Sequence, residues 1–261
     1  MKKKAVFFDI DGTLVAYDGT IPDSTVLALK KLRENGHLAV ISTGRTKPLI
    51  MPELFELGFD GIVAGCGSYV EYEGNEVYSG AADIDWIMAI SQRLAADGLS
   101  PFLESPVGLY YFPELVGERE RATVEYYRKL LSGKYMPVCD DVKVSKMYVP
   151  LYGGAFNIEN YNEFAEYFDI LVHGNVAVEL VPKIYNKATG MEHFINAVGI
   201  DREDTYAIGD SLNDAHMLSF AGTGIVMGGA FEEVKKYADY ITTDIKDDVI
   251  YNALKHFGLI D

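Results

Sequence analysis

The chain has 261 residues, 49% of them hydrophobic and 24% charged, which suffices for one large globular domain or two modest ones. A formal net charge of −16 argues against a nucleic-acid or anionic-membrane partner, because no excess of Lys and Arg can neutralise phosphates. The apolar run after Lys4 stops at Asp9, short of the ~7–15 residues of a signal-peptide core, and no stretch reaches the ~18 apolar residues of a membrane span.

The two cysteines, Cys66 and Cys139, are too few and too far apart in sequence to predict a disulfide framework or a metal cage. We expect both thiols to be small buried side chains in a reducing environment. A cytoplasmic location is the simplest prediction that fits this cysteine usage, and no protein partner is implied.

The first part of the chain alternates between short apolar runs and helical patterns. Such runs predict strands buried on both faces, and their alternation with helices is typical of a parallel sheet with crossover connections. The predicted strands are 5–8, 38–42 and 61–64, and the predicted helices are 24–35 and 49–57. Residues 69–78, with Glu73-Gly74-Asn75 at their centre, predict a hairpin.

The pattern changes at about residue 82 and returns at about residue 183. Between these points the elements follow no simple β/α alternation, which favours an α+β insert. Its predicted helices are 84–96, 118–131 and 160–168, and its predicted strands are 108–112, 143–151 and 177–181. After the insert, the predicted helices are 189–198, 215–220, 232–238 and 247–257, and the predicted strands are 205–208, 224–226 and 240–242. We therefore predict a doubly wound α/β core, residues 1–81 and 183–261, interrupted by a second domain, residues 82–182.

Two carboxylates follow the first predicted strand, in the segment Asp9-Ile10-Asp11-Gly12-Thr13-Leu14. Ligands of open parallel sheets bind beyond the carboxyl ends of the strands, and Gly12 permits the turn that would let both carboxylates face a ligand. Two like charges ~4 Å apart repel by about 4 kcal/mol at an effective dielectric of 20, and a bound Mg²⁺ ion would relieve that repulsion. Taken alone, the segment fits a helix-capping pair of turn carboxylates equally well.

Three further segments extend this pattern, and with them the sequence resembles the haloacid dehalogenase (HAD) superfamily, in its Cof-type sugar-phosphatase-like branch. The four matching segments are Asp9–Leu14, Ile41-Ser42-Thr43-Gly44-Arg45, Lys187, and Gly209-Asp210-Ser211-Leu212-Asn213-Asp214. They occur in the family's order, each at a predicted strand end or helix start. The resemblance implies a Rossmann-like core, a C2-type cap formed by the insert, and Mg²⁺-dependent hydrolysis of a small phosphorylated metabolite, with sugar phosphates as the foremost class.

The resemblance also implies the catalytic and metal-binding residues. Asp9 would attack phosphorus to form an aspartyl-phosphate, and Asp11 would act as general acid and then as general base. Asp9, Asp210 and the backbone carbonyl of Asp11 would hold Mg²⁺. Asp214 would support Lys187 from outside the metal's own ligands, although direct ligation stays an alternative.

The remaining site residues would bind the substrate. Thr43 would donate its hydroxyl and backbone N–H to phosphate oxygens, and Lys187 would place a positive charge beside the phosphate and Asp9. The other implied phosphate-binding residues are Gly44 and Asn213. Arg45 would reach the substrate or the cap, with a surface ion pair as the equal alternative. Seen singly, Thr43 and Lys187 also fit a strand-end cap and a solvated helix-start lysine.

Two loops depart from the family's usual sequence: Cys66-Gly67-Ser68 stands where many relatives have Asn-Gly-Ala, and Gly228-Gly229-Ala230 where many have Gly-Asn-Ala. Neither departure touches the four matching segments. The tyrosines of the insert could stack on a sugar ring, but they fit the insert's own core better. The alternatives to a phosphatase are a sugar phosphomutase and a protein that binds sugar phosphates without turnover.

Overall fold

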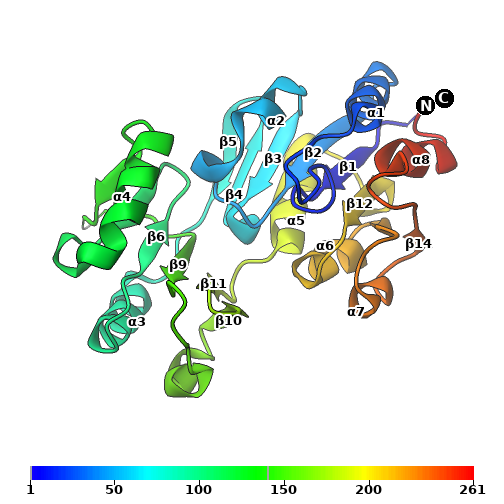
Figure 1. Ribbon diagram of the computed structural model, residues 1–261. Helices are drawn as coiled ribbons and strands as arrows, with labels where there is room; N and C mark the ends of the chain where they lie inside the picture. The colour runs from blue at the N-terminus through cyan, green and yellow to red at the C-terminus, as the bar shows by residue number, and fades with distance from the viewer. Residues whose placement is uncertain (1, 140) are drawn as a thin grey trace. The chain divides into compact units, whose positions relative to one another are not determined.

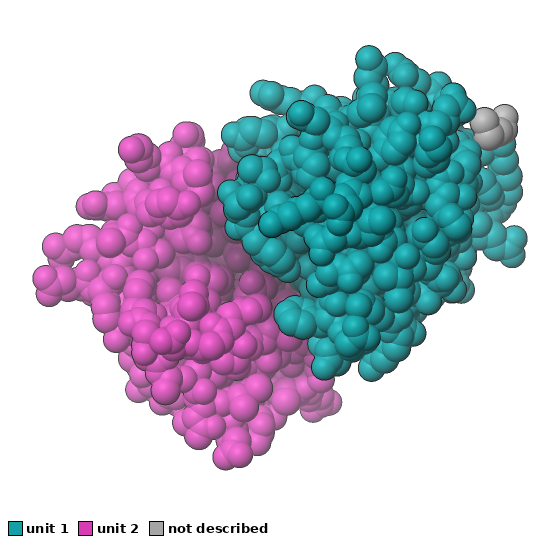
Figure 2. Space-filling model, turned by 45° about the vertical axis from the view of Figure 1, so that its right-hand side comes forward, with its two compact units in different colours: residues 1–44, 51–78, 186–261 teal, residues 45–50, 79–185 magenta. Residues whose placement is uncertain are grey.

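The computed structural model describes residues 2–139 and 141–261, which divide into two compact units (Figures 1 and 2). Unit 1 comprises Met1–Gly44, Met51–Tyr78 and Asn186–Asp261, and unit 2 comprises Arg45–Ile50 and Ser79–Tyr185. The sequence interpretation did not assign the segment Arg45–Ile50 to the insert. Across the two described ranges, no helix is both long enough and apolar enough to span a membrane.

Unit 1 is built on a sheet whose strand order is β14-β13-β12-β1-β2-β3-β4-β5. Every pairing from β14 to β3 is parallel, and β3 pairs with β4 in the antiparallel sense. The chain therefore builds outward from β1 in both directions, which is the arrangement of a doubly wound α/β fold. The strands are β1 Ala5–Phe8, β2 Leu38–Ser42, β3 Gly61–Ala64, β4 Tyr69–Tyr72, β5 Asn75–Ser79, β12 Thr205–Gly209, β13 Thr223–Val226 and β14 Tyr240–Ile241.

The helices of unit 1 pack in two groups, α1 with α8 and α5 with α6 (Figure 1). The second group covers one apolar face of the sheet, where the rings of Phe7 and Phe194 meet edge to face with centroids 5.5 Å apart. Because every residue of β1 is buried, the strand is apolar along its length, as the sequence predicts. The helices are α1 Asp23–Glu34, α2 Pro52–Glu56, α5 Lys187–Val198, α6 Ala215–Phe220, α7 Glu232–Lys235 and α8 Val249–His256.

The helix predicted over residues 49–57 is shorter than expected. A 3₁₀ turn at Lys47–Leu49 is followed by α2, and Met51 between them has an extended backbone with φ −61° and ψ 131°. Proline disfavours the helical conformation of the residue before it, so Pro52 can start α2 but prevents the helix from continuing backwards through Met51. The prediction of a single helix was wrong for this reason.

Unit 2 contains a sheet with the order β10-β11-β9-β6-β7-β8 and two α-helices of ordinary length, α3 Ile84–Ala96 and α4 Glu118–Leu130. The strands are β6 Phe102–Glu104, β7 Leu109–Tyr111, β8 Tyr135–Pro137, β9 Lys146–Pro150, β10 Phe168–His173 and β11 Ala177–Pro182. The predicted helix 160–168 is wrong, since a 3₁₀ turn at Ile158–Phe164 gives way to β10, which pairs with β11. Gly174, with φ +57°, lies in the turn of that hairpin.

The prediction that both cysteines are buried is also wrong. Cys139 is exposed, and Cys66 is partly exposed with a left-handed backbone, φ +57°.

A buried charged cluster lies on one face of the unit 2 sheet. The Lys146 ammonium is 2.7 Å from Glu179 and 3.8 Å from Glu104, and Glu104 also accepts a hydrogen bond from the Thr46 hydroxyl at 3.1 Å. Burial raises the pKa of Glu104, and the neighbouring Lys146 charge opposes that effect. The bond from Thr46 attaches the segment Arg45–Ile50 to the sheet of unit 2.

Lys146→Met is expected to destabilise the protein by about 3–5 kcal/mol, because it removes the cation from two neighbouring carboxylates. Denaturant unfolding followed by circular dichroism measures the loss. Adding Glu104→Gln to this variant should recover part of the stability, since the amide removes the more deeply buried of the two carboxylates that lost Lys146. A single variant as stable as the wild type would show that the cluster contributes nothing to folding.

Candidate active site

Three of the predicted residues follow directly on adjacent strands of unit 1. Asp9 follows β1, Thr43 follows β2 and Asp210 follows β12, and all three side chains are buried. Because β2, β1 and β12 are parallel neighbours, their carboxyl ends lie at one edge of the sheet. The strand order reverses at this point, where doubly wound sheets bind their ligands.

Lys187 connects two of the carboxylates. Its ammonium lies 2.6 Å from an oxygen of Asp9 and 2.5 Å from an oxygen of Asp214, and its side chain is 1% exposed. The lysine is the first residue of α5, and the preceding Asn186 caps that helix in a capping box with Thr189. Burial disfavours the ammonium, but the charges of Asp214 and Asp9 raise the pKa of Lys187 above its usual value, so the side chain stays charged.

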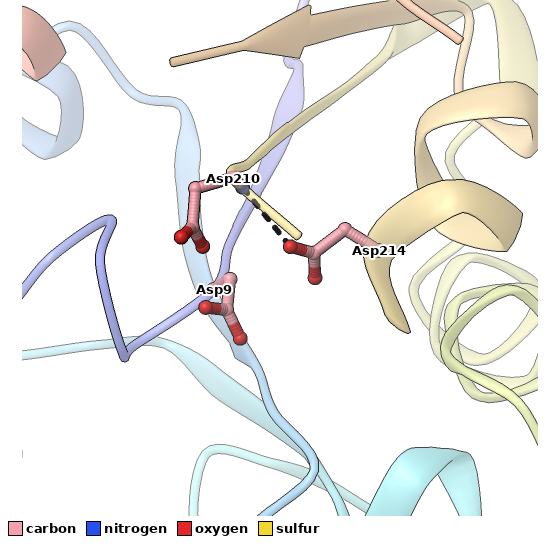
Figure 3. A group of neighbouring side chains, drawn as sticks. All are labelled: Asp9, Asp210 and Asp214. Atoms are coloured by element: carbon pink, nitrogen blue, oxygen red, sulfur yellow. Dashed lines mark hydrogen bonds between the residues drawn. The ribbon is translucent and has the colours of Figure 1, made fainter. Parts of the chain in front are cut away.

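Both oxygens of Asp214 have donors. One accepts from Lys187, and the other accepts the backbone N–H groups of Asp210 and Ser211 at 3.0 Å each. Figure 3 shows the bond from Asp210 as a dashed line. Gly209 permits this approach, because a Cβ there would lie 2.6 Å from the Asp214 carboxyl carbon. Asp214 is therefore held as a fixed counterion of Lys187.

Asp210 accepts hydrogen bonds from two hydroxyl groups, Tyr17 at 2.9 Å and Thr13 at 3.4 Å. Neither residue was assigned a role from the sequence. Gly12, with φ +87°, lies against the same carboxylate, since a Cβ there would be 2.3 Å from its oxygen. Desolvation of the hydroxyl, followed by its bond to Asp210, raises the pKa of Tyr17 to about 12, so this group is a donor at neutral pH.

The carboxylates of Asp9, Asp210 and Asp214 come close together. One oxygen from each lies within 4.8 Å of the others, and Figure 3 shows the three side chains converging. Burial, followed by the charge of Asp214, raises the pKa of Asp9 above its usual value, while Lys187 lowers it. Burial, again followed by Asp214, raises the pKa of Asp210 to about 6. Lys187 pairs with two of these three carboxylates, and its one charge does not balance all three, so the cluster carries excess negative charge.

The donor set fits a hard divalent cation. Asp9 uses one oxygen for Lys187 and keeps the other, and each Asp210 oxygen retains acceptor capacity beside its hydroxyl partner. Carboxylate oxygens are the ligands that Mg²⁺ prefers, and a cation would offset the excess charge. Asp214 fits less well, because both of its oxygens are occupied.

The loop after β2 approaches the same region. A Cβ on Gly44 would lie 3.5 Å from the Cys66 sulfur and 3.9 Å from the Asn213 amide nitrogen, so three loops meet there. Asn213 is exposed and accepts a hydrogen bond from the Ser211 hydroxyl at 2.7 Å. One detail of the prediction for Thr43 is wrong: its backbone N–H already donates to the Val63 carbonyl at 2.8 Å and is not available to a phosphate.

Two of the predicted residues need separate mention. Asp11 is exposed at the turn after β1, where it forms an isolated bridge with Val15. Arg45 belongs to unit 2, where its guanidinium donates to the Leu49 carbonyl at 3.2 Å. The remaining predicted site residues all belong to unit 1.

Fold and site together define an α/β enzyme with an acidic centre at the switch point of its sheet. Residues 6–254 match the family described as haloacid dehalogenase-like hydrolase, and the chain belongs to that family. The predicted resemblance and the predicted α/β fold are thus confirmed.

Relatives of similar length support the same assignment. The chain is 30% identical over 268 residues to a Bacillus subtilis protein named "Putative phosphatase YkrA", covering 100% of both. A crystal structure of a Geobacillus kaustophilus hypothetical protein shares 30% identity at a TM-score of 0.85, covering 99% of this chain and 100% of that one. The structure of the HAD subclass IIB sugar phosphatase BT4131 shares 28% identity at a TM-score of 0.81, with the same coverage. The prediction that the chain is a phosphatase-class enzyme is confirmed at this level.

Asp210→Asn is expected to stabilise the metal-free protein above neutral pH. The folded chain binds the Asp210 proton more tightly than the unfolded chain, so the stability that this proton contributes is lost as pH rises through about 6. The amide mimics the protonated acid at every pH. In EDTA, the variant should exceed the wild type in unfolding free energy by about 1–3 kcal/mol at pH 8 and by roughly zero near pH 4. Denaturant titrations at the two pH values measure the difference, and an equal gain at both would contradict the electrostatic cause.

Proposed function

We propose that the protein is a Mg²⁺-dependent phosphatase that hydrolyses small phosphorylated metabolites, foremost sugar phosphates, through an aspartyl-phosphate on Asp9. The observation that carries the proposal is the buried Lys187 ammonium between Asp9 and Asp214, beside Asp210, at the switch point of the sheet. A buried lysine paired in this way is expensive to build, and buried charged groups gathered at the ligand-binding end of a sheet are typical of a functional site.

Asp9, Asp210 and the backbone carbonyl of Asp11 would hold the magnesium ion. Bound there, the ion would offset phosphoryl charge and align the reacting oxygens. Asp214 would fix Lys187 rather than ligate the metal, because both of its oxygens accept other hydrogen bonds.

In the first half-reaction, a carboxylate oxygen of Asp9 attacks phosphorus. The bond between phosphorus and the ester oxygen breaks, and Asp11 donates a proton to the leaving alkoxide. In the second half-reaction, Asp11 takes a proton from water, and the resulting hydroxide attacks the phosphorus of the aspartyl-phosphate. Orthophosphate leaves, and Asp9 is regenerated as a carboxylate. The exposed position of Asp11 suits a residue that exchanges protons twice.

Lys187 would stabilise the phosphoryl oxygens while it orients Asp9. The Thr43 hydroxyl, the loop at Gly44 and the Asn213 amide would complete the phosphate site, with the Thr43 backbone N–H excluded by its bond to Val63. Arg45 would contact the substrate's alcohol portion or unit 2 itself. We take sugar phosphates as the foremost class because BT4131 is described as a sugar phosphatase.

Asp9→Asn is expected to abolish phosphate release while leaving the fold intact, since the amide has a similar shape but is a poor nucleophile. Orthophosphate release is measured over a panel of sugar and cofactor phosphates, with Mg²⁺ or EDTA. Wild-type release should require Mg²⁺, and the loss in the variant should be at least about 10³-fold. Most of the activity surviving in the variant would refute covalent catalysis by Asp9. A wild type that only isomerises sugar phosphates would instead be a mutase, and one that binds them without turnover would be a binding protein.

Asp11→Asn tests the general acid. The variant should turn over a sugar phosphate about 10²–10⁴-fold more slowly, because its alkoxide leaving group needs a proton. p-Nitrophenyl phosphate, whose leaving group is stable as an anion, should be less affected in its first half-reaction, which single-turnover kinetics isolate. Equal losses for both substrates in that step would argue against the acid role.

A further inference from the structure

Tyr17 holds an unusual position beside the proposed metal ligand Asp210. Its hydroxyl donates to an Asp210 carboxylate oxygen at 2.9 Å, yet the residue as a whole is 84% exposed. Burial of the ring therefore contributes little to keeping the side chain in this place. The hydrogen bond at its tip is the interaction that fixes it.

The turn that carries Tyr17 is ordered by its own hydrogen bonds. The Ala16 N–H donates to the Thr20 carbonyl and the Gly19 N–H to the Ala16 carbonyl, both at 2.8 Å. The Asp18 carboxylate accepts from the Thr20 N–H at 3.0 Å. Such a turn presents its second residue in a defined direction, so the Tyr17 ring is aimed before any ligand binds.

Gly12 makes the contact possible. A Cβ on Gly12 would lie 2.3 Å from the Asp210 oxygen and 2.9 Å from the Tyr17 hydroxyl, which are the two atoms of the hydrogen bond. Any side chain at this position would drive the two groups apart. Because Gly12 has no side chain, the Tyr17 hydroxyl has space to reach the buried carboxylate. Gly12 also adopts a left-handed conformation, with φ +87°.

Tyr17 and Asp210 also line a cavity of about 370 Å³ within unit 1, together with Gly12, Asp18, Asp244 and Lys246 among others. Liquid water occupies ~30 Å³ per molecule, so this space admits several waters beside Asp210. Mg²⁺ loses its waters reluctantly and usually keeps several when bound. The cavity thus leaves room for such waters on the side of Asp210 that Tyr17 borders.

We infer that Tyr17 is a positioning residue for Asp210, orienting its carboxylate for the cation through the hydroxyl–carboxylate hydrogen bond. The inference rests on the proposed Mg²⁺-dependent function. A donor to one oxygen limits rotation of the carboxylate and leaves the other lone pairs available, and partners of this kind typically change metal affinity by about 10–100-fold. Thr13 contacts the other oxygen at 3.4 Å, a longer and weaker bond, so Tyr17 is the principal donor.

The test compares Tyr17→Phe with Tyr251→Phe, a matched control that removes a hydroxyl bonded at 2.9 Å to the Asp261 carbonyl in the same unit. Thermal unfolding is recorded without substrate over a series of Mg²⁺ concentrations, and turnover over the same series. Tyr17→Phe should need about 10–100-fold more Mg²⁺ for half of its stabilisation and half of its activity, with turnover at saturating Mg²⁺ close to the wild-type value. Tyr251→Phe should follow the wild type.

Two results would overturn the inference alone. One is a Mg²⁺ requirement of Tyr17→Phe within about twofold of the wild type. The other is a loss of turnover at saturating Mg²⁺ with an unchanged requirement, which would place Tyr17 on the substrate instead of on Asp210. A wild type that is neither stabilised nor activated by Mg²⁺ would overturn the proposed function and this inference with it, so the two failures are distinguishable.

Discussion

The active-site end of unit 1 depends on one buried ammonium between two carboxylates. Lys187 is removed from water at a cost that only close anionic partners can offset, and Asp9 and Asp214 supply them at 2.6 and 2.5 Å. Asp9 follows β1, Asp214 ends the 3₁₀ turn before α6, and Lys187 begins α5. The ion pairs therefore form only when three elements from distant parts of the chain are docked on the sheet, which couples completion of the fold to completion of the site.

The same interaction leaves the site short of positive charge. Asp214 is the more completely satisfied partner of Lys187, since two backbone N–H groups bond its second oxygen. The negative charges of Asp9 and Asp210 are less completely compensated, so burial raises the pKa of both carboxyl groups. In a chain of net charge −16, a phosphate dianion is repelled at long range, so its attraction must come from a local cation. The excess negative charge of the site is thus the property that would favour Mg²⁺ and phosphate together.

Much of unit 1 could be predicted because its signals are local. Short apolar runs followed by polar residues located β1, β2 and β12, and the resemblance to the family made the residues after them site candidates. Prediction failed where a local signal was misread, as at Pro52 and in the hairpin around Gly174, or where contacts are non-local. The bond from Tyr17 to Asp210 joins residues 193 positions apart through the gap at Gly12, and no spacing in the sequence encodes that distance. Assignment of Arg45–Ile50 to unit 2 depends likewise on a tertiary contact, Thr46 with Glu104.

The predicted site residues are divided unequally between the two units. Every group to which we assign bond making or metal binding lies in unit 1, and Arg45 is the single predicted site residue that lies in unit 2. Unit 2 has its own apolar core and its own buried charge cluster around Lys146, so it can accept surface substitutions without disturbing Lys187 or its carboxylates. Changes in unit 2 then leave the carboxylates and Lys187 of unit 1 in place. Substitutions near Asp210, such as at Gly12 or Tyr17, would instead change the response to the metal for all substrates alike.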